Sequence, residues 1–387
     1  MDDKKILGMN TNSIVSGIEA GSFSENKNVD SLYNVTAYLS DLAGCGFYRI
    51  AQPFMWLEER RAANIKLMNI TSLIVHRRFS NLLIIQRQFH EKIMDHLKMV
   101  KEKYQIPIVY ELDDDLWGIS RNSPAFSTYH KSDVLTRAKE CINFCDAVTT
   151  STTPLAKVLR EFNDNVFVLP NCLDFRLWKQ RKEHLDKEKI VIGWFGSPTH
   201  FDDLDRIKNV FTTILNKNKN VIFRFMGYLY APLKNYVSTG RVELVKGVKV
   251  EQYPRHAQLN APDIFLIPVT DTRFNHSKSS LKWLEAAAMG VPVVASNEMP
   301  YKSVISHGKT GFLANTDIEW LNYINELIES AELRAKIGQA SYEWVKKNRS
   351  ISNEYLKWDQ VYRSVIKGDY SGAKEFNIDN LKGEDIN

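Results

Sequence analysis

Short apolar runs rich in β-branched residues alternate with longer helical patterns along nearly the whole chain, and this alternation limits the possible folds most. Strand-like runs cover residues 34–39, 83–88, 106–112, 146–151, 165–170, 189–197, 221–227, 242–248, 263–269 and 291–296. Strands separated by helices are typical of βαβ units, in which successive strands lie parallel. The chain is therefore expected to be an α/β protein built on parallel sheets.

The rhythm is interrupted once, by a charged segment without a strand pattern at residues 176–189. A chain of 387 residues also exceeds the roughly 250–300 residues at which single cores stop growing. We therefore expect an N-terminal domain at 1–175, a linker at 176–189 and a C-terminal domain at 190–350. The rest of the chain is expected to form an apolar-striped helix at 351–366, which must dock on something, and a mobile polar tail at 367–387.

The composition is that of a folded protein of a reducing compartment. Apolar residues make up 44% and charged residues 25%, and 51 Lys+Arg against 46 Asp+Glu leave a net charge of +5. The four cysteines form no CxxC pair, which argues against a disulfide framework or a structural zinc site. No apolar stretch has the length of a signal peptide or a membrane span, so we expect a cytoplasmic protein.

The most informative segment is 263–296, DIFLIPVTDTRFNHSKSSLKWLEAAAMGVPVVAS. We expect a strand, a polar loop, a helix from about residue 279 to 289 that Gly290 ends, and another strand. Free N–H groups, the helix dipole, hydroxyls and two cations would then meet at one helix N-terminus, which suits a diphosphate. The donor-binding candidates there are Asn275, Ser277, Lys278, Ser279, Ser280 and Lys282. Glu285, one to two turns into the helix, could accept hydrogen bonds from ribose hydroxyls.

A simpler interpretation is that Ser279 only caps the helix, the lysines are solvated and Glu285 is exposed. Each residue alone fits that interpretation. The whole set, together with Gly290 and the flanking strands, favours a phosphate-binding helix.

The sequence LEAAAMGVPVVAS resembles the E-x-x-x-x-G-x-P-V-V-A-S signature of the retaining glycosyltransferases with the GT-B fold. The resemblance implies two Rossmann-like, doubly wound parallel-sheet domains with a cleft between them. It also implies that Glu285 binds the ribose of a nucleotide, and it makes Lys278 and Lys282 candidate phosphate partners.

Three further segments resemble the same family in the same order, so the resemblance spans roughly residues 34–366. IGWFGSPTHFDDL (192–204) resembles the first strand and loop of the nucleotide domain, which implies that Gly196 and Ser197 face the donor. GCGFYRIAQP (44–53) resembles the Gly-rich loop beside the donor phosphate and implies the same place for Gly44, Gly46 and Arg49. HGKTGFLAN (307–315) resembles the segment after the VVAS strand.

The chain also departs from the family pattern. Many members carry a second glutamate eight residues before the position of Glu285, and here that residue is Ser277. The Arg…Lys pair common in the C-terminal domain is not evident after Gly196, and Lys278 and Lys282 could compensate for it.

The segment ELDDDLW (111–117) closes a strand where relatives often place a histidine-aspartate pair beside the transferred sugar. By this resemblance Asp113 and Asp114 are the catalytic candidates. A carboxylate at that end of a parallel strand faces the cleft, where it can orient a hydroxyl, accept a proton or stabilise positive charge. Two other interpretations are a helix cap, with Asp115 as cap, and a Mg²⁺ or Mn²⁺ site, which belongs to a different glycosyltransferase architecture.

Three arginines of the first half, Arg77, Arg78 and Arg87, are candidates for an acceptor groove, where they could contact phosphates of a nucleic acid or a lipid-linked acceptor. The alternative interpretation is that these arginines are solvated charges on loops.

The sequence therefore predicts a hexosyl- or pentosyltransferase that uses a nucleotide-diphosphate sugar as co-substrate, with no permanently bound cofactor and no required metal. Retention of configuration is implied by the resemblance alone. The predicted acceptor is a glycan or lipid-linked saccharide, with a nucleic-acid acceptor, a hydroxymethylated base of phage DNA, left open. The alternatives are a nucleotide-sugar epimerase or hydrolase and a catalytically silent nucleotide- or glycan-binding scaffold. Nothing in the sequence predicts the oligomeric state.

Overall fold

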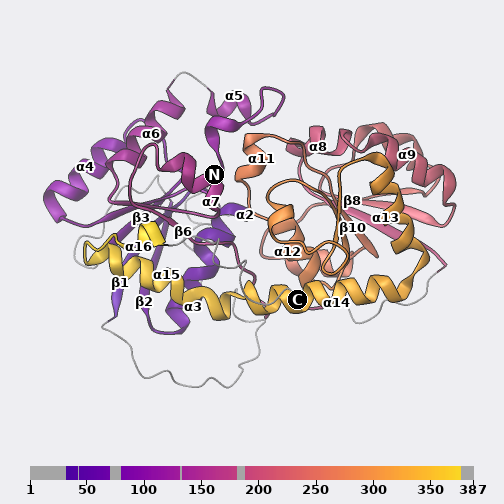
Figure 1. Cartoon of the computed structure of the whole chain (residues 1–387). Helices are drawn as coiled ribbons and strands as arrows, with labels where there is room; N and C mark the ends of the chain where they lie inside the picture. The colour runs from indigo at the N-terminus through magenta and orange to yellow at the C-terminus, as the bar shows by residue number, and fades with distance from the viewer. Residues whose placement is uncertain (1–31, 42, 70–79, 131–132, 181–187, 376–387) are drawn as a thin grey trace.

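The computed structural model describes residues 32–41, 43–69, 80–130, 133–180 and 188–375. These residues form two α/β halves that lie side by side, each built on a six-stranded parallel sheet (Figure 1). The expected class, two Rossmann-like domains with parallel sheets, is confirmed.

The N-terminal sheet has the strand order β2-β1-β3-β4-β5-β6. Its strands are β1 (Tyr33–Leu39), β2 (Ala63–Asn69), β3 (Leu82–Gln86), β4 (Ile108–Glu111), β5 (Ala147–Thr150) and β6 (Val166–Val168). One face packs against α4 (Ile93–Tyr104), α6 (Val134–Phe144) and α7 (Thr153–Leu159), and the other against α3 (Gln52–Glu59). β3 and β4 are buried at every position because helices cover both faces of the sheet.

The C-terminal sheet has the strand order β12-β11-β10-β7-β8-β9. Its strands are β7 (Ile190–Phe195), β8 (Val221–Met226), β9 (Val242–Val245), β10 (Ile264–Ile267), β11 (Val293–Ser296) and β12 (Phe312–Ala314). One face packs against α8 (Phe201–Asp205), α9 (Lys208–Lys217) and α13 (Asp317–Glu329), the other against α10 (Tyr253–Leu259) and α12 (Leu281–Ala288).

Each sheet reverses its direction of winding once, between β1 and β3 in the first and between β7 and β10 in the second. Ligands of open α/β sheets bind outside the carboxyl ends of the strands at such reversals. The topology therefore directs attention to the loops that follow these four strands.

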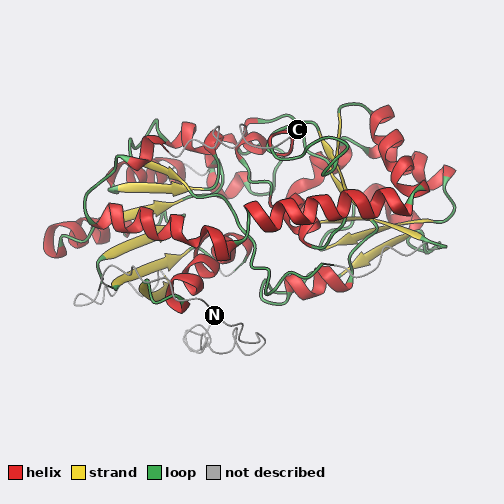
Figure 2. Cartoon of the chain, turned by 60° about the horizontal axis from the view of Figure 1, so that its bottom comes forward, coloured by secondary structure: helices red, strands yellow, loops and turns green. Residues whose placement is uncertain are grey.

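Two consecutive helices connect the halves (Figures 1 and 2). α14 (Ala331–Asn348) contacts α12 of the C-terminal half, and α15 (Ile351–Ile366) contacts α3 of the N-terminal half. The apolar stripe of α15, which includes Trp358, is buried in the N-terminal core. α15 thus completes the core of the first domain.

Three local features differ from expectation. β2 is not among the expected strands; the chain leaves α3 at Glu59, and Arg61 adopts a φ of 54° before β2 begins at Ala63. The polar loop expected before α12 contains α11 (Arg273–Ser277). Part of the expected mobile tail is packed, because α16 (Gly372–Glu375) contacts β6 and Ala373 is fully buried.

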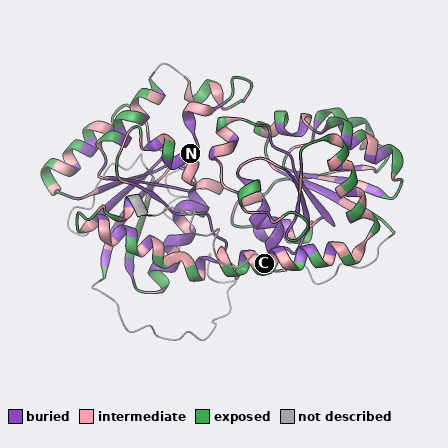
Figure 3. Cartoon of the chain, in the orientation of Figure 1, coloured by how far each residue is buried: buried purple, intermediate pink, exposed green. Residues whose placement is uncertain are grey.

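The strands of both sheets are mostly buried, whereas the exposed residues lie mainly on the surrounding helices and loops (Figure 3). Trp194, Trp283 and Trp358 are each at most 2% exposed. All four cysteines are free thiols. Within the described ranges, no helix combines the length and apolarity needed to cross a membrane.

Candidate active site in the cleft between the domains

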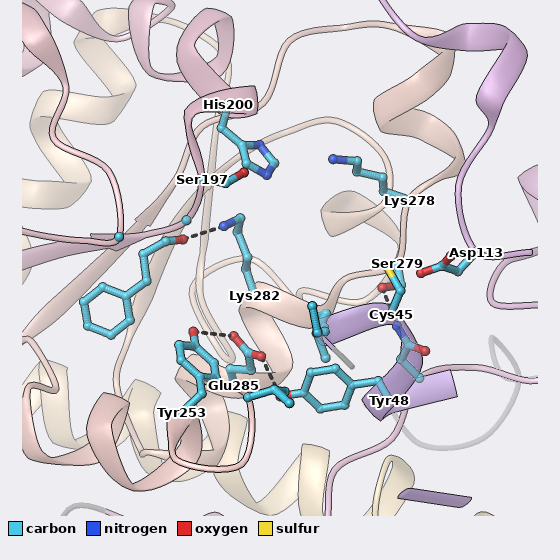
Figure 4. Close-up of a pocket in the computed structure, with 18 of the residues that line it drawn as sticks. Cys45, Tyr48, Asp113, Ser197, His200, Tyr253, Lys278, Ser279, Lys282 and Glu285 are labelled. Atoms are coloured by element: carbon cyan, nitrogen blue, oxygen red, sulfur yellow. Dashed lines mark hydrogen bonds between the residues drawn. The ribbon is translucent and has the colours of Figure 1, made fainter. Parts of the chain in front are cut away.

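A cleft of about 900 Å³ lies between the two halves, at the carboxyl ends of their strands. The N-terminal half contributes Asp41, Ala43, Gly44, Cys45, Tyr48, Asp113, Asp114 and Asn171. The C-terminal half contributes the loop after β7, the segment 247–251 and the start of α12. Figure 4 shows the side chains that point into this space.

Glu285 lies at one end of the cleft and is held by two tyrosines. Tyr48 Oη of the N-terminal half donates to Glu285 Oε1 at 2.8 Å, and Tyr253 Oη of α10 donates to Oε2 at 3.0 Å. Burial raises the pKa of Glu285, against the lowering effect of Tyr48 and Lys282. Each carboxylate oxygen keeps a second lone pair, so the group can still accept hydrogen bonds from a ligand.

The local sequence explains why α12 presents Glu285 and Lys282 to the cleft. Trp283, Leu284, Ala287 and Ala288 share one face of the helix and are buried in the hydrophobic core. Residues three apart share a helix face, which places Lys282 and Glu285 together on the other side. Gly290, with a φ of 69°, ends the helix as expected.

Two lysines, Lys278 and Lys282, also line the cleft. Lys282 Nζ donates to the carbonyl oxygen of Phe195 and lies 4.9 Å from the ring centre of Trp194. Burial lowers the pKa of Lys282 to about 8, although Glu285 opposes the shift. Lys278 Nζ lies 4.4 Å from the ring centre of Phe274.

The loop after β7 lies against these lysines. Gly196 and Ser197 both line the cleft. A Cβ at Gly196 would lie 2.8 Å from Lys282 Nζ and 2.6 Å from the Trp194 ring, so only glycine allows this approach.

The same loop brings His200 into the cleft. Its Nδ1 lies 2.8 Å from Asp203 Oδ2. The other oxygen of Asp203 accepts hydrogen bonds from Thr270 and Asn275, so Asn275, a donor-binding candidate, supports the wall of the cleft.

An acidic cluster lines the opposite wall. Arg87 Nη2 forms ion pairs with Asp113 and, at 3.0 Å, with Asp114. Although burial alone raises the pKa of Asp113, Arg87 holds it below its ordinary range. Cys45 lies beside them, and burial, reinforced by Asp113, raises the pKa of its thiol. Asp113 is therefore an ionised carboxylate that faces the cleft.

This cluster offers ligand atoms for a metal: those of Cys45, Asp113 and Asp114 lie within 4.8 Å of one another. The guanidinium of Arg87 already supplies positive charge to both carboxylates. Asp115 has a different role, because its side chain accepts from Gly118 N at 3.1 Å as the expected cap.

Arg49, expected beside the donor, lies outside the cleft and is fully buried. It donates to Glu111 at 2.7 Å, to the carbonyl oxygen of Leu169 and to Asn171 Oδ1 at 3.0 Å. A buried guanidinium needs an opposite charge and hydrogen-bond acceptors around it, and the sequence pattern did not reveal these partners. Its effect on the cleft is indirect, through Asn171.

Three other donor-binding candidates do not line this cleft. Gly46 packs on the backbone of Asp41, where a Cβ would lie 2.0 Å from the carbonyl oxygen. Ser277 is 2% exposed, and its carbonyl oxygen accepts from Thr152 at 2.7 Å. Ser280 lines a smaller adjacent cavity. By contrast Gly44, Lys278 and Ser279 line the cleft.

The three arginines predicted to line an acceptor groove are Arg77, Arg78 and Arg87. Arg77 and Arg78 lie outside the described residues. Arg87 is described, and its guanidinium is engaged by Asp113 and Asp114 rather than presented to an open groove.

The halves are joined around the cleft by side-chain contacts. Besides the Tyr48–Glu285 bond, Asn171 Nδ2 donates to Ser279 Oγ at 2.8 Å. Arg273 Nε donates to the buried Asp115 Oδ2 at 2.7 Å. Residues of both halves therefore fix the start of α12.

Sequence reasoning missed Cys45, Tyr48, Asn171, His200 and Tyr253 as cleft residues. Cys45, Tyr48 and His200 stand inside segments that carried the family resemblance, so their position was a usable signal. No motif marks Asn171 or Tyr253, which reach the cleft only through the tertiary fold.

Comparison with known proteins begins with the sequence. Residues 189–330 match the family described as glycosyl transferases group 1. The chain is 23% identical over 295 residues to the putative teichuronic acid biosynthesis glycosyltransferase TuaH of Bacillus subtilis, covering 69% of this chain and 67% of that protein.

Solved structures resemble the whole fold. HepE of Anabaena, crystallised with UDP, superposes with a TM-score of 0.59 at 16% identity, covering 86% of this chain and 100% of that one. Sucrose-phosphate synthase of Thermosynechococcus elongatus gives a TM-score of 0.65 at 12% identity, covering 88% and 100%. At these identities the structures establish the fold, which is GT-B.

Proposed function

We propose, from the premise that the chain is a group 1 glycosyltransferase with the GT-B fold, that its cleft binds a nucleoside-diphosphate sugar and transfers the glycosyl group to an acceptor hydroxyl. The observation that carries the proposal is the arrangement along α12. Glu285, Lys282 and Lys278 all line the cleft, and Lys282 lies between Glu285 and the space beside Lys278 (Figure 4). A carboxylate suits ribose hydroxyls and cations suit a diphosphate, so one nucleotide can satisfy both.

We propose uridine diphosphate as the nucleotide of the donor. HepE, which shares the fold, has been crystallised with UDP and with UDP-glucose. The sugar itself is left open between hexose and pentose.

Leaving-group stabilisation follows from the charges. Bond cleavage leaves negative charge on the diphosphate, and preorganised cations with the N–H groups at the start of α12 stabilise that charge. Lys278 and Lys282 supply the positive charge that a divalent metal supplies elsewhere, so we expect transfer without a metal.

Asp113 is the proposed catalytic carboxylate. It is ionised, faces the cleft and is anchored by Arg87. In this place it can orient the acceptor hydroxyl or stabilise positive charge on the sugar as the glycosidic bond breaks. Retention of configuration is part of the proposal and follows from the family resemblance.

The proposed acceptor is a glycan or a lipid-linked saccharide, and the reaction a cytoplasmic one. This proposal draws on TuaH, a relative named for teichuronic acid biosynthesis. Four free thiols fit a reducing compartment. A modified DNA base is the other acceptor class; its binding would weaken steeply with salt, whereas binding of a neutral glycan would not.

The test is a panel of UDP-, GDP-, ADP- and TDP-sugars, scored for thermal stabilisation and for nucleoside diphosphate release with and without EDTA. Stabilisation by UDP-sugars, with release that needs an added acceptor and survives EDTA, is the expected result. Release without any acceptor would indicate a hydrolase instead. Binding without release in the presence of glycan, lipid-linked and DNA acceptors would indicate a silent scaffold, and no stabilisation by any donor would refute the proposal.

A further inference from the structure

His200 is a titratable side chain in the cleft that the proposed function has not yet used. It ends the short helix η4 (Pro198–His200), which follows β7 and precedes α8. Its side chain is 15% exposed and lines the cleft. Nδ1 contacts Asp203, whereas Nε2 has no hydrogen-bond partner among the described residues.

Asp203 fixes the state of the ring. Its Oδ1 accepts from Thr270 N at 2.8 Å, Thr270 Oγ1 at 3.0 Å and Asn275 Nδ2 at 2.9 Å, which leaves Oδ2 for His200. Burial alone would raise the pKa of Asp203, but these donors and His200 hold it below its ordinary range. An ionised Asp203 can only accept, so Nδ1 carries the proton and the lone pair of Nε2 faces the cleft.

The charges around the ring keep it neutral in the empty cleft. Burial, then Lys282 and Lys278, lower the pKa of His200 to about 4, and Asp203 only partly opposes them. The uncharged ring of Trp194 lies edge-on to the His200 ring, with 6.0 Å between the ring centres. Figure 4 shows His200, Lys278 and Lys282 around one space, with Lys282 between that space and Glu285.

A diphosphate in that space would reverse the electrostatics at Nε2. Negative oxygens next to a bare lone pair repel it, whereas a protonated Nε2 donates a charge-assisted hydrogen bond. Nearby negative charge also favours the protonated form of a histidine.

We propose that His200 is a third cation of the donor diphosphate site: Nε2 takes up one proton from solvent as the diphosphate binds, and then donates to a phosphate oxygen while Asp203 holds Nδ1–H. The inference rests on the proposed function and deepens it. No bond of the donor breaks in this step, and the only transfer is one proton from buffer to Nε2.

The consequence is a donor affinity that depends on pH in a defined direction. Because binding takes up a proton, the affinity increases as the pH falls from the pKa of His200 in the complex towards its lower value in the free protein. Lys282 contributes little at pH 6, since a lysine with a pKa of about 8 is already protonated there.

The test is isothermal titration of the full chain with UDP-glucose at pH 6, in buffers of different ionisation enthalpy. UDP-glucose is chosen because its diphosphate is esterified at both ends, whereas a terminal phosphate itself titrates near pH 6. The wild type is expected to take up about one proton per UDP-glucose bound, and His200→Asn close to none. His200→Asn keeps an amide N–H for Asp203 but has no titratable group.

Two further variants keep the result interpretable. His90→Asn, at an exposed position, is the control and should take up as many protons on binding UDP-glucose as the wild type does. His200→Gln, which offers an uncharged donor near the place of Nε2, guards against a folding defect of His200→Asn. At pH 6 His200→Asn should bind UDP-glucose about tenfold more weakly than the wild type, and the difference should shrink by pH 9.

The inference would be overturned if the wild type bound UDP-glucose without taking up a proton. It would also be overturned if both His200 variants still took up the proton. Either result would leave the proposed donor binding intact. No binding of UDP-glucose by the wild type would instead remove the proposed uridine donor and this inference with it.

Discussion

Glu285 has the clearest predicted phenotype, because ribose binding is its proposed role. Glu285→Ala should weaken UDP binding about 10- to 100-fold, since it removes charge-assisted hydrogen bonds to two hydroxyls. Glu285→Gln, which keeps one acceptor oxygen for the tyrosines and the ribose, should lose less. Calorimetric titration with UDP measures both; equal affinity of wild type and Glu285→Ala would remove this residue from the nucleotide site.

Asp113 should separate turnover from binding. Asp113→Asn keeps the shape of the side chain but loses the negative charge that we propose acts on the reacting sugar. Turnover should fall about 100-fold or more, while the Kd of the donor changes little. Asp95→Asn, at an exposed position of α4, is the control. An Asp113→Asn enzyme with unchanged kcat would exclude a catalytic role for the carboxylate.

Lys282 should set the alkaline limit of donor binding. Its pKa is lowered to about 8, so in the free protein the ammonium loses its proton as the pH rises through that value. Only the charged form attracts a diphosphate, so affinity should decline above about pH 8 by up to tenfold per pH unit. Lys282→Arg, which stays charged, should move this decline to higher pH. Identical alkaline profiles of the two proteins would show that Lys282 does not contact the donor.

At the level of elements, the helix that carries the site could be predicted because several independent signals agree. Gly290, the alanines at 286–288 and the apolar run at 291–296 all indicate a helix followed by a buried strand. β2 could not be predicted in the same way, because it is an edge strand with the polar residues Asn64 and Lys66 and therefore lacks a continuous apolar run.

The site itself was partly predictable for a similar reason. The residues of α12 lie in one motif and those of the loop after β7 in another, so the arrangement within each segment follows from local sequence. The burial of Arg49 depends on Glu111 and Asn171, which are distant in the chain, and a cation near glycines resembles a phosphate ligand until that pairing is known. Tyr253 reaches Glu285 from another helix, and no local pattern encodes that contact.

α15 gives a prediction about stability at this scale. Trp358 is 1% exposed and packs in the N-terminal core, although it lies beyond the C-terminal domain in sequence. Trp358→Ala should lower the free energy of unfolding by about 3 to 5 kcal/mol. Leu356→Ala on the same helix, at a position that is 45% exposed, should cost far less. Urea denaturation checks both, and equal midpoints for the two variants would contradict the docking of α15.

At the scale of the whole molecule, the cleft is a shared property of two domains. Tyr48 and Asn171 of the first domain bond to Glu285 and Ser279 at the start of α12. The opposite wall presents Asp113 from the end of β4. In the proposed function, a donor held by the second domain would have its sugar directed at the first, which is the arrangement that transfer to a bound acceptor requires.

The most direct test of this account is a crystal structure of the chain with UDP. The ribose hydroxyls should lie within hydrogen-bond distance of Glu285, and the diphosphate should lie against Lys278, Lys282 and the start of α12. A nucleotide bound outside this cleft, or one in the cleft whose ribose leaves Glu285 in contact only with Tyr48 and Tyr253, would contradict it.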